Sequence, residues 1–238
     1  MVTLVNTQEI EEVGEAALRK FLGRRRHTPQ CIDIEGLIRD FLHANIEYAV
    51  FAGKDAGKIG FLSDGRYALS VKEKGRIVDK VYPKGTIVID RSLLHEDRSG
   101  QRRFTLAHEA AHLLYARMTP LVPGPCFKSE SARVYDIVEL RKRMDVGETQ
   151  VDRMASVLLM PRFLMEQTLR DYCFALALPM YGESVMRSKD KLAIQKMADA
   201  VGVSYSAFLN RLKELDMIEH RSIEEYIDLE MNFKEGAG

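Results

Sequence analysis

The sequence has few cysteines and none in a pairing motif. Its three cysteines, Cys31, Cys126 and Cys173, are an odd number and lie far apart in a chain of 238 residues. This spacing argues against a disulfide framework and against a zinc site built from thiolates. A reducing compartment, the cytoplasm, is therefore the expected location.

Net charge and long apolar runs are also missing. The 35 basic side chains are balanced by 35 acidic ones, so no overall field draws the chain to nucleic acid or to an anionic membrane. The N-terminal segment is acidic and lacks the basic start and apolar core of a signal peptide. The apolar run from Cys173 to Met180 is far shorter than the roughly 20 residues that span a bilayer. We therefore expect neither a signal peptide nor a membrane-spanning segment.

What the sequence does contain is a clear alternation of helical and β-rich stretches. Apolar residues at helical spacing predict helices over 7–21 and 34–42. Four short β-rich runs between 46 and 90, separated by glycine and proline, predict a small, mainly antiparallel sheet, namely IEYAVF, KIGFL, YALSV and GTIVID. Helical spacing returns over 103–117 and over 147–159. The expected fold class is therefore α+β.

A last helical stretch covers 189–215 and is interrupted around Gly202. It follows the proline that ends the preceding predicted helix. We expect a main domain over 1–165 and a helical C-terminal region over 166–238.

The segment FTLAHEAAHLLY carries His108, Glu109 and His112. On a helix, residues four apart lie on the same face, so both imidazoles can bind one metal ion. A carboxylate beside the first histidine can take a proton from a metal-activated water and pass it to the leaving amine. The pattern therefore predicts a zinc-dependent peptidase with Glu109 as general base. The alternative interpretation is a chance match on a core helix, against which the amphipathic character of this helix argues.

Catalytic zinc needs a third protein ligand. The metzincin extension is absent, because Tyr115 and Met118 stand where that motif requires Gly and His. A glutamate from a later helix is then the alternative, and Glu148 opens the helix predicted over 147–159. Asp152 follows one turn later and is placed to orient the ring of His108. Spacing alone leaves three other carboxylates in competition with Glu148, namely Glu130, Asp136 and Glu139.

The strings RRFTLAHEAAHLL and ETQVDRMASVLLMP resemble the motif helices of the ImmA/IrrE family of metallopeptidases. That family pairs an (R)FTxAHExxHxLL helix with a later ExxANxFAxxLLMP helix. Glu148 matches the glutamate that serves as third ligand, and Asp152 matches the Asn of the pattern. Val151 and Met154 replace the first Ala and the Phe. The resemblance implies a zincin-like domain with Glu148 as third ligand, and zinc, or alternatively manganese, as the metal.

The resemblance also implies a partner. Members of the family carry out limited proteolysis of a helix-turn-helix repressor, which relieves repression of a mobile element or a stress response. Most of the chain is consistent with the family, but only the two motif helices are specific. The residues themselves predict the peptidase site, whereas the repressor substrate comes from the resemblance alone.

Substrate binding and charge stabilisation are predicted less sharply. The strand Thr86–Asp90 precedes the motif helix and is a candidate edge on which an extended peptide could pair, with an internal core strand as the alternative. Stabilisation of the oxyanion needs a Tyr, His or Arg near the metal. Tyr115, Tyr181 and His95 are eligible, and the sequence does not choose among them.

The C-terminal region has a second interpretation as a DNA-binding element. Ala198, Gly202 and Phe208 have a spacing compatible with helix-turn-helix geometry. A DNA-binding helix in this segment would present a polar face to DNA, made of Ser204, Ser206, Asn210 and Arg211. The acidic end of the chain would repel phosphate. A DNA-binding regulator that retains the zincin scaffold without proteolysis is therefore the alternative function, and a hydrolase of narrow, non-peptide specificity is a third.

Basic side chains also cluster at three places, Arg24 to Arg26, Arg102-Arg103 and Arg141 to Arg143. The expected role of each cluster is a solvated surface. Arg102 or Arg103, which directly precede the motif, are also candidates to steady the motif helix or its substrate.

Overall fold

The structure is a computed structural model that describes residues 6–23, 30–118, 126–129 and 147–235. The chain divides into two compact units, residues 1–26 with 32–161 and residues 27–31 with 162–238. The division falls just before the expected domain boundary at residue 165. The alternative third ligands Glu130, Asp136 and Glu139, and the arginine clusters at 24–26 and 141–143, lie outside the described residues.

The first unit mixes helices with a small sheet, as the α+β expectation requires. Its elements, in chain order, are α1 (Thr7–Leu22), α2 (Ile34–Gly36), the π-helical turn η1 (Leu37–Phe41), β1 (Ile46–Ala49), the short turn η2 (Gly53–Asp55), β2 (Lys58–Leu62), β3 (Ala68–Glu73), β4 (Arg76–Val81), β5 (Ile87–Asp90), the short turns η3 (Arg91–Leu94) and η4 (Glu96–Arg98), α3 (Ser99–Met118), β6 (Cys126–Ser129) and α5 (Glu148–Leu159).

Local capping explains where two of these helices begin. Asn6 and Glu9 form a reciprocal capping box at the start of α1, with N–H to carboxylate and N–H to amide distances of 2.8 and 2.9 Å. Asp33 accepts a hydrogen bond from the backbone N–H of Gly36 at 2.9 Å and begins α2.

The described sheet has the strand order β1-β5-β2-β6. β1 and β5 are parallel, whereas β2 is antiparallel to both β5 and β6. The prediction that Thr86–Asp90 offers a free edge is wrong, because β5 lies between β1 and β2 and both of its backbone edges are used. The internal position follows from the sequence of β5, in which Ile87, Val88 and Ile89 are fully buried.

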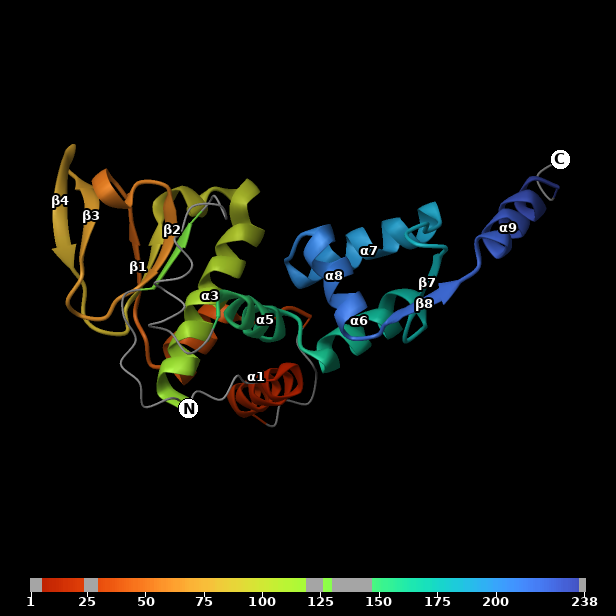
Figure 1. The fold of residues 1–238 in the computed structure, drawn as a ribbon, viewed down its shortest axis with the longest axis horizontal. Coiled ribbons are helices and arrows are strands. Elements are labelled where there is room, and N and C mark those ends of the chain that lie inside the picture. Colours follow the sequence, from red (N-terminus) through yellow and green to blue (C-terminus); the bar gives the residue numbers. More distant parts are fainter. Residues whose placement is uncertain (1–5, 24–29, 119–125, 130–146, 236–238) are drawn as a thin grey trace. The chain divides into compact units, whose positions relative to one another are not determined.

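The two faces of this sheet are covered by different parts of the first unit. Residues alternate between faces along β2, with Gly60 facing α3 and Phe61 facing away from it. Phe61 belongs to an apolar cluster with residues of the β3–β4 hairpin, including Leu69 and Val71. Figure 1 shows α3 beside the sheet and α5 crossing α3. The motif helix is thus held between the sheet and α5.

The second unit contains helices and one pair of short strands. Its elements are α6 (Arg162–Cys173), β7 (Leu178–Tyr181), α7 (Ser188–Val201), α8 (Tyr205–Glu214), β8 (Ile218–Arg221) and α9 (Ile223–Glu235). β7 and β8 pair in parallel, a feature that the expected helical C-terminal region did not include. The expected break is present, since α7 ends at Val201, Gly202 follows with φ 75°, and Ser204 caps α8.

None of the helices in the described ranges combines the length and the apolar content that a bilayer span requires.

Candidate metal centre

The motif helix α3 carries its three chemically important side chains in a buried environment. His108 and His112 are one turn apart and only 2% and 3% exposed, and Glu109 is fully buried. Their imidazole rings meet edge to face, with centroids 4.8 Å apart. The distance between the two Nε2 atoms is 3.1 Å. Helical spacing thus brings two ring nitrogens to one point.

Helix α5 brings a carboxylate to the same point. Glu148 Oε2 lies 3.3 Å from His108 Nε2, and Glu148 Oε1 lies 3.8 Å from His112 Nε2. One ligand atom from each of these three residues lies within 4.8 Å of the others, and the group could hold a metal ion. Ligand atoms about 2.0–2.1 Å from a tetrahedral zinc lie roughly 3.3 Å from one another. The donor set therefore fits such an ion without a large rearrangement.

Asp152 determines which nitrogen of His108 faces this group. Its Oδ1 lies 2.8 Å from His108 Nδ1. An ionised carboxylate can only accept, so Nδ1 carries the hydrogen, and in the neutral ring Nε2 presents a lone pair toward His112 and Glu148. A carboxylate behind a ligating imidazole is the usual support of metal-bound histidine.

The histidines keep Glu148 in its ionised form. Burial by itself would raise the pKa of this carboxyl group, but when the imidazoles are protonated the hydrogen bond from His108 and the charges of both rings lower the pKa overall. Its side chain is still 58% exposed. The carboxylate therefore stands between the buried histidines and solvent, where a substrate could reach it.

Glu109 is held from the side of the sheet. A Cβ atom added to Gly60 in β2 would lie 2.5 Å from Glu109 Oε1 and 2.7 Å from Thr105 Cγ2. Real Cβ atoms do not approach neighbours this closely, so a side chain at residue 60 would have to displace the side chains of Glu109 and Thr105. Gly60 was not among the predicted site residues. A glycine inside the β-rich run KIGFL is the signal that could have identified it.

The three candidates for oxyanion stabilisation lie in different places. Tyr115, on α3, donates a hydrogen bond to the carbonyl oxygen of Gln150 at 3.4 Å, and burial raises the pKa of its phenol to about 12. This contact ties α3 to the first turn of α5, which begins with Glu148. His95 is exposed between η3 and η4, and Tyr181 is buried in β7 of the second unit.

The proposed DNA-reading face of the second unit is only partly present. Ser204 uses its hydroxyl to cap α8, accepting from the N–H of Ala207 at 3.2 Å. Ser206 and Asn210 are exposed. Arg211 is 1% exposed and its guanidinium pairs with Glu214 at 3.1 Å. The expectation that Arg211 points to DNA is therefore wrong, because its side chain is part of the interior.

A comparison with known proteins adds nothing to this geometry. No model of a protein family matches the sequence, and no curated protein matches it either. The observation on which a function can be built is therefore the cluster itself, in which two histidines of α3 and a carboxylate of α5 converge at distances suited to one metal ion.

Proposed function

We propose that this chain is a zinc-dependent endopeptidase that cuts a protein partner at a limited number of bonds. The observation that carries the proposal is the convergence of His108, His112 and Glu148, with Asp152 orienting the first histidine. Two nitrogen donors and one carboxylate suit zinc and leave a coordination position open. Manganese is the alternative metal, since it also accepts imidazole and carboxylate ligands.

Each residue has a distinct part in the proposed reaction. When bound, the ion would polarise the substrate carbonyl and make water a better nucleophile. Glu109 accepts the proton that the attacking water loses and delivers it to the amine nitrogen of the departing peptide. Asp152 holds the proton on Nδ1 of His108, which keeps the ring in its ligating orientation. Tyr115 supports the turn of α5 that carries Glu148.

The proposed substrate is a helix-turn-helix transcriptional repressor of a mobile element or a stress response. This part of the proposal rests on the resemblance of the two motif helices to the ImmA/IrrE family. Glu148 is partly exposed to solvent beside the two buried histidines. A protein substrate could therefore approach the cluster from the side of Glu148.

Direct DNA binding by α7 and α8 is the weaker candidate. Burial of Arg211 removes the cation of the proposed reading face. Helix α9 in the same unit adds acidic side chains that repel phosphate, namely Glu224, Glu225, Asp228 and Glu230.

The test is co-expression of the chain with a helix-turn-helix repressor encoded beside it. We expect Glu109→Gln to bind one equivalent of zinc as the unmodified chain does, because the three ligands remain. Cleavage should fall by at least about a hundredfold, because the general base is lost. Metal content by atomic spectroscopy and cleavage by mass spectrometry measure the two effects separately.

Glu96→Gln is the matched control, because Glu96 is an exposed carboxylate of the same unit in the turn before α3. It should cleave normally. Cleavage by Glu109→Gln at the rate of the control would contradict the proposed mechanism.

A further inference from the structure

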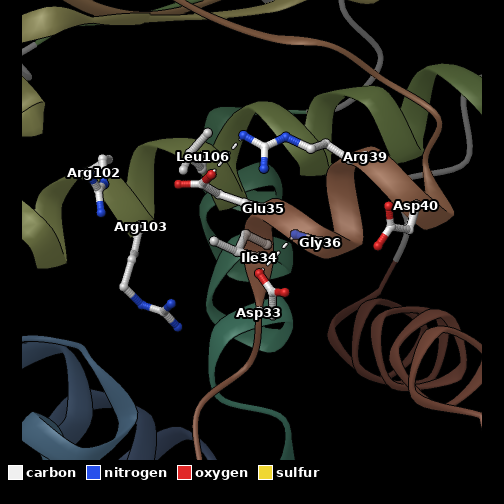
Figure 2. Close-up of a pocket in the computed structure, with 9 residues that line it drawn as sticks. All are labelled: Asp33, Ile34, Glu35, Gly36, Arg39, Asp40, Arg102, Arg103 and Leu106. Carbon is white, nitrogen blue, oxygen red and sulfur yellow. Dashed lines mark hydrogen bonds and ion pairs between the residues drawn. The ribbon is translucent and has the colours of Figure 1, made fainter.

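A cavity in the first unit lies between the segment that starts with α2 and the N-terminal half of α3 (Figure 2). Its volume is about 350 Å³. This is within the range of roughly 300–1,000 Å³ typical of small-molecule sites. Ile34 and Leu106 give it apolar walls, and the remaining wall is charged.

The cavity is separate from the metal centre although both involve α3. Leu106 lines the cavity and His108 follows it by two residues. On an α-helix this spacing turns the side chain by about 200°, so the two residues face opposite sides. A ligand in the cavity would therefore not contact the histidines.

Most of the charged groups around the cavity already have partners within the protein. Glu35 pairs with Arg39 at 2.9 Å, as the dashed line in Figure 2 shows. Asp33 accepts a hydrogen bond from the N–H of Gly36. Arg103 donates from Nη2 to the carbonyl oxygen of Ile32 at 2.9 Å. These contacts stabilise the walls of the cavity and do not call for a ligand.

Asp40 also lines the cavity but is exposed to solvent, so Arg102 is the exception among the buried charged groups. Its Nε is buried, and no group in the described part of the chain accepts a hydrogen bond from it. A buried donor without an acceptor costs free energy, and such groups are uncommon in native proteins. Figure 2 shows Arg102 and Arg103 at the same end of the cavity. This end therefore combines an unused guanidinium donor with the positive charge of a second arginine.

We propose that this cavity binds a small ligand carrying a carboxylate or a phosphate, with Arg102 as the anchoring residue. A planar guanidinium matches both oxyanions through two parallel N–H to oxygen hydrogen bonds. On binding, the Arg102 side chain would have to turn for its buried Nε to reach an acceptor on the ligand. Ile34 and Leu106 would contact the carbon skeleton of an organic ligand.

Titration of the purified full chain with succinate and, separately, with inorganic phosphate tests the proposal. Isothermal calorimetry measures the affinity, and the two probes distinguish the carboxylate from the phosphate. We expect at least one probe to bind in the millimolar range or more tightly. Arg102→Gln should weaken that binding by about ten- to a hundredfold, the usual effect of losing hydrogen bonds to a charged group. Arg102→Lys should weaken it less, since it keeps the charge.

Arg91→Gln is the control for the loss of one positive charge, because Arg91 is exposed in η3 and does not line the cavity. It should bind the probe like the unmodified chain. Binding should also persist after metal is removed with a chelator, since the metal ligands face elsewhere. Failure of both probes to bind, or an equal loss in Arg91→Gln and Arg102→Gln, would overturn the proposal.

Discussion

A single proton on His108 decides whether the cluster can bind a metal ion. Asp152 holds that proton on Nδ1, at an Nδ1 to Oδ1 distance of 2.8 Å. Without the carboxylate, the proton could move to Nε2, the atom that lies 3.3 Å from Glu148. A protonated Nε2 cannot ligate metal, so a fraction of the molecules would lose one ligand.

Asp152→Asn should therefore lower zinc affinity by about ten- to a hundredfold. Competition with a chromophoric chelator measures this change. Ser156→Ala is the control, because Ser156 lies one turn further along α5 and its hydroxyl bonds only within that helix, to the carbonyl oxygen of Asp152. Equal affinities for Asp152→Asn and Ser156→Ala would show that the carboxylate does not orient the ring.

The sequence predicts the residues of this cluster better than it predicts their surroundings. Two histidines four apart, and a glutamate at the start of a later helix, are local patterns that can be read without a structure. The close approach of Gly60 to Glu109 is not local, because it depends on how α3 packs on β2. That the Nε of Arg102 has no acceptor among the described residues is likewise visible only when its neighbours are known.

At the scale of elements, the position of α5 depends on how closely α1 approaches it. Gly14 lies in the middle of α1, where glycine usually costs helix stability. A Cβ atom at this position would lie 2.5 Å from Val157 Cγ1 and 3.1 Å from the sulfur of Met154. The glycine thus allows α1 to pack directly against α5, the helix that carries Glu148.

Gly14→Ala should destabilise the first unit by about 1–2 kcal/mol, because overpacking outweighs the gain of up to about 1 kcal/mol in helix propensity. Urea unfolding followed by circular dichroism measures the change. The double variant Gly14→Ala/Val157→Ala should lose less stability than the sum of the single variants, because the shorter side chain leaves room for the new methyl group. Additive losses would contradict the close packing.

The helices that the sequence predicts are those with one apolar face. α1, α3 and α5 have this pattern, and the structure contains helices at all three places. β4 was missed because it is exposed along its whole length and has no buried alternation. α6 was missed because Pro161 was interpreted as the end of one helix, although a second helix starts directly after it. The pairing of β7 with β8 joins segments far apart in the sequence, which local patterns cannot indicate.

At the scale of the whole molecule, each compact unit needs its own sources of stability, and the first contains a buried ionic network. Asp55 is fully buried and accepts hydrogen bonds from Lys58, Tyr67 and the backbone N–H of Ser70 at 2.6, 2.9 and 2.8 Å. Burial would raise the pKa of this carboxyl group, but the hydrogen bonds lower the pKa below its ordinary value of 3.8.

The sign of the pH dependence follows from this shift. A lowered pKa means that Asp55 stabilises the folded state fully above pH 3.8, and that this stability is lost as the pH falls toward its folded pKa. Asp55→Asn should cost about 2–4 kcal/mol at neutral pH, because Lys58 loses its partner, and should weaken the acid dependence of unfolding. Urea titrations at neutral and acidic pH measure both effects. An unchanged acid dependence in Asp55→Asn would exclude this network as its source.

The contact between Gly60 and Glu109 links two positions that are far apart in the sequence. With Glu109 in its present position, a side chain at residue 60 would have to displace the carboxylate. If residue 109 became smaller, this contact would disappear, but Thr105 Cγ2, at 2.7 Å, would still have to move. Among related chains, we therefore expect glycine at position 60 to accompany glutamate at position 109. A related chain without a glutamate at position 109 could then also differ at position 60. The loss of the general base would be visible both in the motif helix and in a strand that carries no catalytic group.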